Sequence, residues 1–71
     1  MKPERLVAMV NDIAAFFAAE PDRKTAVEGV RNHLTRFWEP RMRREVIAYY
    51  RAGGSGFSET AAAAVAELRE P

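Results

Sequence analysis

Cysteine is absent from this sequence, and histidine and tryptophan occur only once each. Without thiolates the chain cannot form a disulfide, ligate an iron–sulfur cluster or bind a metal through sulfur. The single His leaves no second imidazole with which to share a metal ion. No segment approaches the roughly 18 to 20 consecutive apolar residues of a membrane-spanning helix. The charged N-terminus is not typical of a secretion signal. The simplest interpretation is a cytoplasmic protein.

The size and the charge of the chain narrow its class further. Its 71 residues lie near the lower size at which one apolar core keeps a protein folded. We therefore predict a single small helical domain over residues 1–71. The net charge is only +1, whereas a dedicated nucleic-acid-binding domain is usually more basic. Arg outnumbers Lys nine to two, and Arg is the cation that suits fixed, bidentate contacts.

The first predicted helix runs from Pro3 or Glu4 to Ala19. Apolar residues recur on one stripe of this segment with helical spacing, which predicts a core-facing side. The predicted core residues here are Leu6, Met9, Val10, Ile13, Phe16 and Phe17. The opposite side carries small residues: Ala8, Asn11, Ala15, Ala18 and Ala19. Two interpretations stay open, since Ala is the best helix former and small side chains also let another element approach closely.

The second predicted helix is capped by Asp22 and ends at Phe37 or Trp38. Its apolar stripe adds Val27, Val30, Leu34 and Phe37 to the predicted core, with Trp38 as a further candidate for burial. Glu39-Pro40 then turns the chain, because proline cannot continue a helix but suits the first turn of a new one.

The third predicted helix runs from Pro40 to about Ala52, and Gly53-Gly54 ends it. Its predicted core edge consists of Met42, Val46 and Tyr49, with Ile47 and Tyr50 beside it. Ser58 is the predicted cap of a fourth helix from Glu59 to about Leu68, with Phe57 packed before the cap. The inner face of this helix is Ala61, Ala64, Val65 and Leu68. No segment alternates with period two, so we predict an all-α, compact bundle of three to four short helices.

Residues that could carry chemistry are few. His33 lies beside the apolar stripe of the second helix, where a histidine at a core edge is the usual interpretation. The glycines at 53, 54 and 56 follow no predicted strand and indicate a turn between helices rather than a phosphate loop. Glu39 and Glu45 flank a basic segment and have no apolar pocket around them, so we do not expect a paired acid and base there. We therefore predict no catalytic, cofactor-binding or metal-binding residue.

The basic segment and its tryptophan are the strongest candidates for a contact surface. The predicted partner interface consists of Arg36, Trp38, Arg41, Arg43, Arg44 and Arg51. Arg, Trp and Tyr are enriched in binding hot spots, which favours a protein interface. A solvated helix face is the second interpretation, helped by the pair Arg41 and Glu45 four residues apart. A stand-alone regulatory protein that binds nucleic acid through Arg41–Arg44 is the third, and a homodimeric helical protein of unknown role is also open.

Four stretches of the sequence form a recognisable pattern: Glu4–Ala19, His33-Leu34, the string Phe-Trp-Glu-Pro-Arg-Met-Arg at Phe37–Arg43, and Gly53-Gly54 with Gly56. In their order and spacing they resemble the delta subunit of bacterial NAD-dependent formate dehydrogenase. The string at Phe37–Arg43 is the most specific, and the match in order and spacing covers nearly the whole chain.

The resemblance implies a small helical subunit without cofactors in a cytoplasmic complex that oxidises formate and reduces NAD⁺. The other subunits of such a complex are implied to carry a molybdenum or tungsten pterin site, iron–sulfur clusters, FMN and the NAD site. The implied role is that of a non-catalytic accessory subunit that stabilises or assembles the cofactor-bearing subunits. Its expected partner is the molybdopterin-bearing large subunit, and self-association of the isolated chain stays open.

Overall fold

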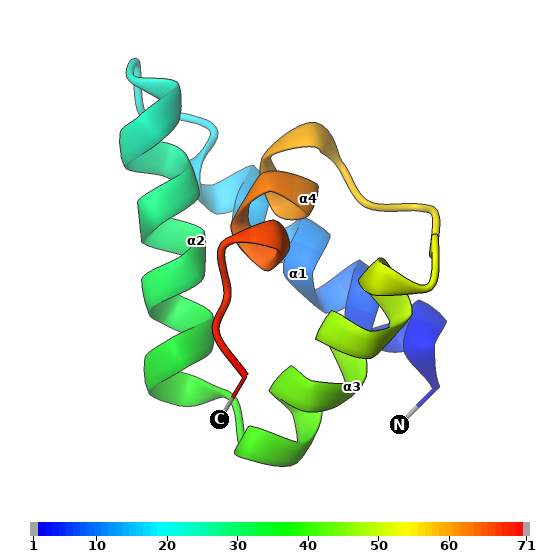
Figure 1. Cartoon of the computed structure of the whole chain (residues 1–71). Helices are drawn as coiled ribbons and strands as arrows, with labels where there is room; N and C mark the ends of the chain where they lie inside the picture. The colour runs from blue at the N-terminus through cyan, green and yellow to red at the C-terminus, as the bar shows by residue number, and fades with distance from the viewer. Residues whose placement is uncertain (1, 71) are drawn as a thin grey trace.

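Four α-helices form the fold in the computed structural model, which describes residues 2–70 (Figure 1). They are α1 (Pro3–Phe17), α2 (Arg23–Phe37), α3 (Pro40–Arg51) and α4 (Glu59–Ala66), and residues 2–70 contain no β-strand. The predicted all-α fold is confirmed. None of these helices is both long and apolar enough to cross a membrane.

The helices α2 and α3 diverge from the corner that joins them, and α4 lies in the space between them (Figure 1). α1 crosses behind α3 and α4, and α4 packs against all three other helices. Small side chains allow this central position, because Ala61 and Ala64 on α4 are completely buried. α4 therefore packs at the centre of the bundle, although it is the shortest helix of the described residues.

The predicted caps define the helix starts. The side chain of Asp22 accepts a hydrogen bond from the backbone N–H of Lys24 at 3.2 Å, and Ser58 accepts one from Ala61 at 3.2 Å. α1 ends at Phe17, two residues before the predicted Ala19. α4 ends at Ala66, two residues before the predicted Leu68. Both predicted helix ends were too long because alanine and leucine extend a helical pattern without marking where it stops.

The turn after α3 follows from its two glycines. Gly53 has a φ of 86°, a left-handed conformation that glycine adopts without a steric penalty. The N–H of Gly54 donates to the carbonyl of Tyr49 at 2.9 Å, and the N–H of Gly53 donates to that of Tyr50 at 3.1 Å. This pair of bonds is the Schellman motif, which satisfies the last carbonyls of a helix. The interpretation of this stretch as a helix-ending turn is confirmed.

One apolar cluster draws side chains from all four helices. Of the residues predicted for the core, the buried ones are Leu6, Val10, Val27, Val30, Leu34 and Val46, and those partly buried against the cluster are Met9, Ile13, Phe17 and Met42. Tyr49 is only half-buried and lies outside the cluster, with its ring centroid 6.1 Å from that of Phe57. Buried residues that the sequence analysis did not place in the core include Val7, Ala14 and Ala26.

The assignment of Phe16 to the core was wrong, because 77% of this residue is exposed. The buried face of α1 includes Val7 and Ala14 in addition to Leu6 and Val10. On a helical wheel the buried face is rotated from the predicted apolar stripe in the direction of Val7. Phe16 therefore lies about a third of a turn from the centre of the buried face. The rotation arises because α1 packs against three helices, and its own apolar stripe does not define where they lie.

The assignment of Phe37 to the core was also wrong, because 70% of this residue is exposed. The inward side of α2 is occupied by Val27, Val30 and Leu34. Trp38 follows the helix end with an extended backbone (φ −83°, ψ 141°) and is 6% exposed. This change of backbone direction places Trp38 in the core cluster and leaves Phe37 on the surface.

Candidate partner-binding surface

The corner between α2 and α3 is held by Arg43. Its Nη1 donates to the carbonyl oxygen of Thr35 at 2.9 Å and to that of Trp38 at 2.7 Å. The last carbonyls of a helix have no partner within the helix, and a cationic donor there also interacts favourably with the helix dipole. Arg43 therefore stabilises the end of α2 from the first turn of α3. The sequence analysis placed Arg43 in the partner interface, but in the structure its guanidinium forms hydrogen bonds within the chain.

Trp38 is not available as an anchor for a partner. Its side chain belongs to the buried cluster, and 6% of the residue is exposed. The prediction of Trp38 as an interface residue was wrong, since sequence pattern alone cannot tell an aromatic residue that fills a core from one that contacts a partner. The expected burial of Trp38 is confirmed, since this residue belongs to the buried cluster.

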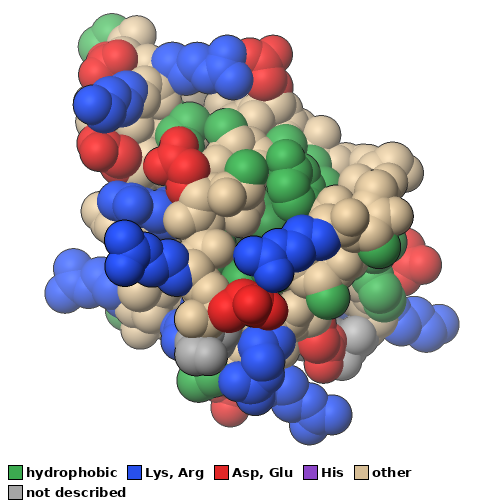
Figure 2. Space-filling model, in the orientation of Figure 1, with side chains coloured by type: hydrophobic (Ala, Val, Ile, Leu, Met, Phe, Trp, Pro, Cys, Tyr) green, Lys and Arg blue, Asp and Glu red, His purple; other side chains and the backbone are tan. Residues whose placement is uncertain are grey.

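Three exposed arginines lie at the same end of the molecule: Arg36 on the last turn of α2, and Arg41 and Arg44 on the first turns of α3. We call these three residues the basic surface. Lys and Arg side chains gather at the lower end of the molecule, where α2 turns into α3 (Figure 2). Arg41 is paired with Glu45 at 3.5 Å, yet 84% of its side chain is exposed. Such an exposed pair contributes little to stability, so Arg41 can exchange this partner for another.

Arg51 lies at the opposite end of α3 and is separated from the basic surface. Its Nη1 lies 3.3 Å from Oε2 of Glu70 in the C-terminal tail. The six residues predicted as one interface therefore divide into three groups. Arg36, Arg41 and Arg44 form the basic surface, Arg43 and Arg51 have partners within the chain, and Trp38 is buried.

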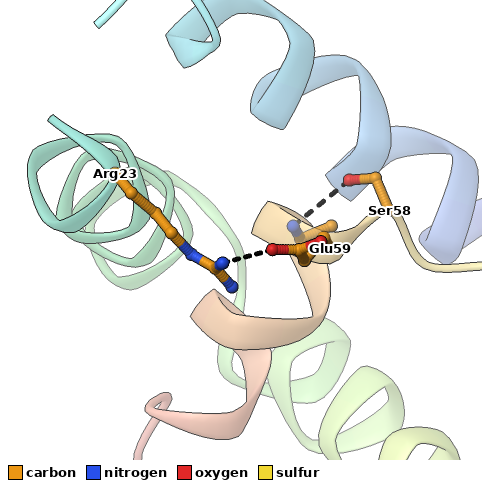
Figure 3. Close-up of polar contacts among 4 residues, drawn as sticks. Arg23, Ser58 and Glu59 are labelled. Atoms are coloured by element: carbon orange, nitrogen blue, oxygen red, sulfur yellow. Dashed lines mark hydrogen bonds and ion pairs between the residues drawn. The ribbon is translucent and has the colours of Figure 1, made fainter. Parts of the chain in front are cut away.

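Polar contacts anchor the start of α4 to the other helices. Arg23 at the start of α2 forms an ion pair with Glu59, next to the Ser58 cap (Figure 3). On the other side, Nδ2 of Asn11 donates to the carbonyl oxygen of Gly56, and its Oδ1 accepts from the N–H of Ser58, both at 2.9 Å. Sequence reasoning missed this role of Asn11. The signal was present, since a lone amide stands among the alanines of the first helix.

Residues 2–70 hold no group of three His, Asp or Glu side chains that could bind a metal ion. The His33 ring packs against Phe37 with 4.8 Å between centroids. A cleft of about 410 Å³ is open to solvent, and its lining includes both cations and carboxylates. Its lining residues are Arg31, Asn32, Thr35, Arg43, Glu67, Arg69 and Glu70.

The chain matches a known protein family. The family model described as NADH-dependent formate dehydrogenase delta subunit FdsD matches residues 5–65. No curated protein and no solved structure matches the chain. The matched range begins in α1 and ends in α4, so it contains the whole corner between α2 and α3 and the basic surface.

Proposed function

The chain belongs to the family of NADH-dependent formate dehydrogenase delta subunits, and we propose that it is a non-catalytic accessory subunit of such a complex. Its role is to stabilise or assemble the cofactor-bearing subunits in the cytoplasm, and its partner is the molybdopterin-bearing large subunit. The family match over residues 5–65 is the observation that carries this proposal.

Two features of the structure support a binding role. Apolar side chains from all four helices fill the interior of the described residues. Their charged side chains therefore lie at the surface, where a partner can contact them. The basic surface presents Arg36, Arg41 and Arg44 together at one corner. Arginine can bind carboxylates through two parallel hydrogen bonds, and it is enriched in protein interfaces. An acidic region of a partner subunit is the complementary surface.

The nucleic-acid alternative has weaker support. Arg43 and Arg51, which belong to the same basic stretch of sequence, have partners within the chain. The remaining basic surface is small, and the net charge of the chain is only +1. Nucleic-acid binding would weaken steeply as salt concentration rises, whereas a packed protein interface would persist.

The proposal is tested by producing the formate dehydrogenase complex with and without this chain. We expect the yield, cofactor content or half-life of the complex to fall when the chain is missing. Formate-dependent NAD⁺ reduction, normalised to molybdenum content, should stay similar. A partner that binds only the assembled state stabilises that state by mass action and leaves the barrier of the chemical step unchanged. A large loss of normalised turnover would instead show that the subunit takes part in catalysis or electron transfer.

A further inference from the structure

Two large apolar side chains are exposed although the chain has a well-filled core. Phe16 is 77% exposed and Phe37 is 70% exposed, and they come from different helices. Each of them contacts a second aromatic ring on its own helix. The rings of Phe16 and Phe17 meet edge to face with centroids 5.2 Å apart, and those of His33 and Phe37 lie 4.8 Å apart.

Gly29 lies between the two pairs of rings. A Cβ atom at position 29 would lie 2.5 Å from Cε1 of Phe17, so the Phe17 ring rests directly on the α2 backbone. His33 follows Gly29 by four residues, and residues four apart lie on the same face of a helix. A line therefore runs from Phe16 over Phe17 and Gly29 to His33 and Phe37. We call the four ring-bearing residues of this line the aromatic seam.

We propose that the aromatic seam is the apolar anchor of the contact between this subunit and another subunit of its complex. This inference rests on the proposed function and adds the surface through which it acts. Exposed aromatic side chains provide large contact area at low cost in side-chain entropy, and they commonly dominate interface energies. Membership in a family of subunits indicates that the chain has a heterologous partner.

The charge beside the seam specifies the chemistry of that partner. Arg36 directly precedes Phe37, and the corner bearing Arg41 and Arg44 follows it. A hydrophobic centre with a polar rim is the usual anatomy of a protein interface, and the rim here is cationic. The complementary surface is an apolar hollow that receives Phe16 and Phe37, with carboxylates on the side that meets the basic surface.

The first test is co-purification of the tagged chain with the other subunits of its formate dehydrogenase. Phe16→Gln/Phe37→Gln should leave the circular-dichroism spectrum and melting temperature of the free chain nearly unchanged, since both side chains are exposed. It should weaken association at least about 30-fold. The matched control is Ala8→Gln/Ala15→Gln, which introduces the same side chains at exposed positions of α1 away from the seam. The control should co-purify like the natural chain.

A labelling experiment keeps the inference testable if the double variant fails to fold. The chain has no Cys, so Phe16→Cys, Phe37→Cys and Ala8→Cys each introduce one thiol whose maleimide labelling can be followed by mass spectrometry of this chain. Labelling at positions 16 and 37 should slow at least tenfold in the complex, while that at position 8 should stay as in the free chain. Equal labelling of all three positions in the free and assembled states would overturn the inference.

The remaining outcomes separate the inference from the proposed function. If the natural chain and the Phe16→Gln/Phe37→Gln variant both co-purify stoichiometrically, the seam is not the anchor, and the accessory role stands. If the natural chain co-purifies with no subunit, the proposed function fails first. Analytical ultracentrifugation of the free chain tests the competing occupant. If the natural chain is a homodimer and the Phe16→Gln/Phe37→Gln variant is a monomer, the seam binds a second copy of the chain. That result would overturn the proposed contact with another subunit.

Discussion

At the scale of single residues, Phe37 and Trp38 show how neighbours in sequence have opposite environments. Trp38 is 6% exposed and Phe37 is 70% exposed. Trp38→Ala removes a buried aromatic side chain and should cost about 3 to 5 kcal/mol, which is comparable to the entire stability of so small a domain. Phe37→Ala should change the free energy of unfolding by less than about 0.5 kcal/mol. Thermal unfolding followed by circular dichroism compares the two, and an unchanged melting temperature for Trp38→Ala would contradict the observed packing.

Gly29 offers a second prediction at this scale. Replacing a glycine within a helix by alanine normally stabilises it by about 1 kcal/mol. At position 29 the added Cβ would lie 2.5 Å from Cε1 of Phe17, so the ring must move away from α2. Gly29→Ala should therefore lower the melting temperature of the natural chain. In a Phe17→Ala background the same substitution should raise it, because the obstacle is gone.

The double-mutant cycle formed by these variants measures the coupling between Gly29 and Phe17. A coupling energy of zero would mean that the Phe17 ring does not rest on α2. Since this contact joins the two halves of the aromatic seam, the cycle also tests the geometry on which the seam depends.

At the scale of the elements, the helix starts could be predicted from sequence because capping is local. Asp22 and Ser58 bond to backbone groups two or three residues away, and Pro40 begins α3 where its missing N–H is harmless. The rotation of α1 could not be predicted in this way. Which side of α1 is buried depends on three helices that pack against it from later parts of the chain, and the apolar stripe in its own sequence carries no information about them.

The attachment of α4 to α1 yields the next prediction. Asn11 makes hydrogen bonds of 2.9 Å to the backbone of both Gly56 and Ser58. Each such bond contributes roughly 0.5 to 1.5 kcal/mol net, so Asn11→Ala should destabilise the chain by about 1 to 2 kcal/mol. Amide hydrogen exchange in α4 should accelerate more than that in α2, because the loop before α4 loses its anchor.

Asn32→Ala is the matched control for this prediction, since it makes the same replacement at an exposed position of α2. It should shift the free energy of unfolding by less than about 0.5 kcal/mol. Equal acceleration of exchange in all four helices of the Asn11 variant would show that α4 has no separate dependence on this contact.

At the scale of the whole molecule, the candidate site was only partly predictable. The concentration of arginine after Arg36 is visible in the sequence, and it marks the corner where three of these side chains are exposed. The sequence does not show which of these arginines have partners within the chain. Arg43 bonds to carbonyls five and eight residues earlier, and Arg51 pairs with Glu70 near the end of the described residues. Both interactions depend on how the chain folds back on itself, and so does the exposure of Phe16 and Phe37.

The basic surface provides the last prediction. Arg41→Glu/Arg44→Glu should leave folding nearly intact, because both side chains are exposed and the repulsion that Arg41→Glu introduces against Glu45 costs only a few tenths of a kcal/mol. Association with the acidic surface of the partner should weaken strongly, since reversed charges meet like charges there. The loss should be largest at low salt, where exposed charges are least screened.

The matched control, Arg5→Glu/Lys24→Glu, changes the net charge by the same amount at exposed positions outside the basic surface. If both variants lose association equally, total charge rather than this corner steers the encounter. If Arg41→Glu/Arg44→Glu still co-purifies stoichiometrically at physiological salt, the partner does not contact the start of α3. Binding would then depend on the aromatic seam without a contribution from the start of α3.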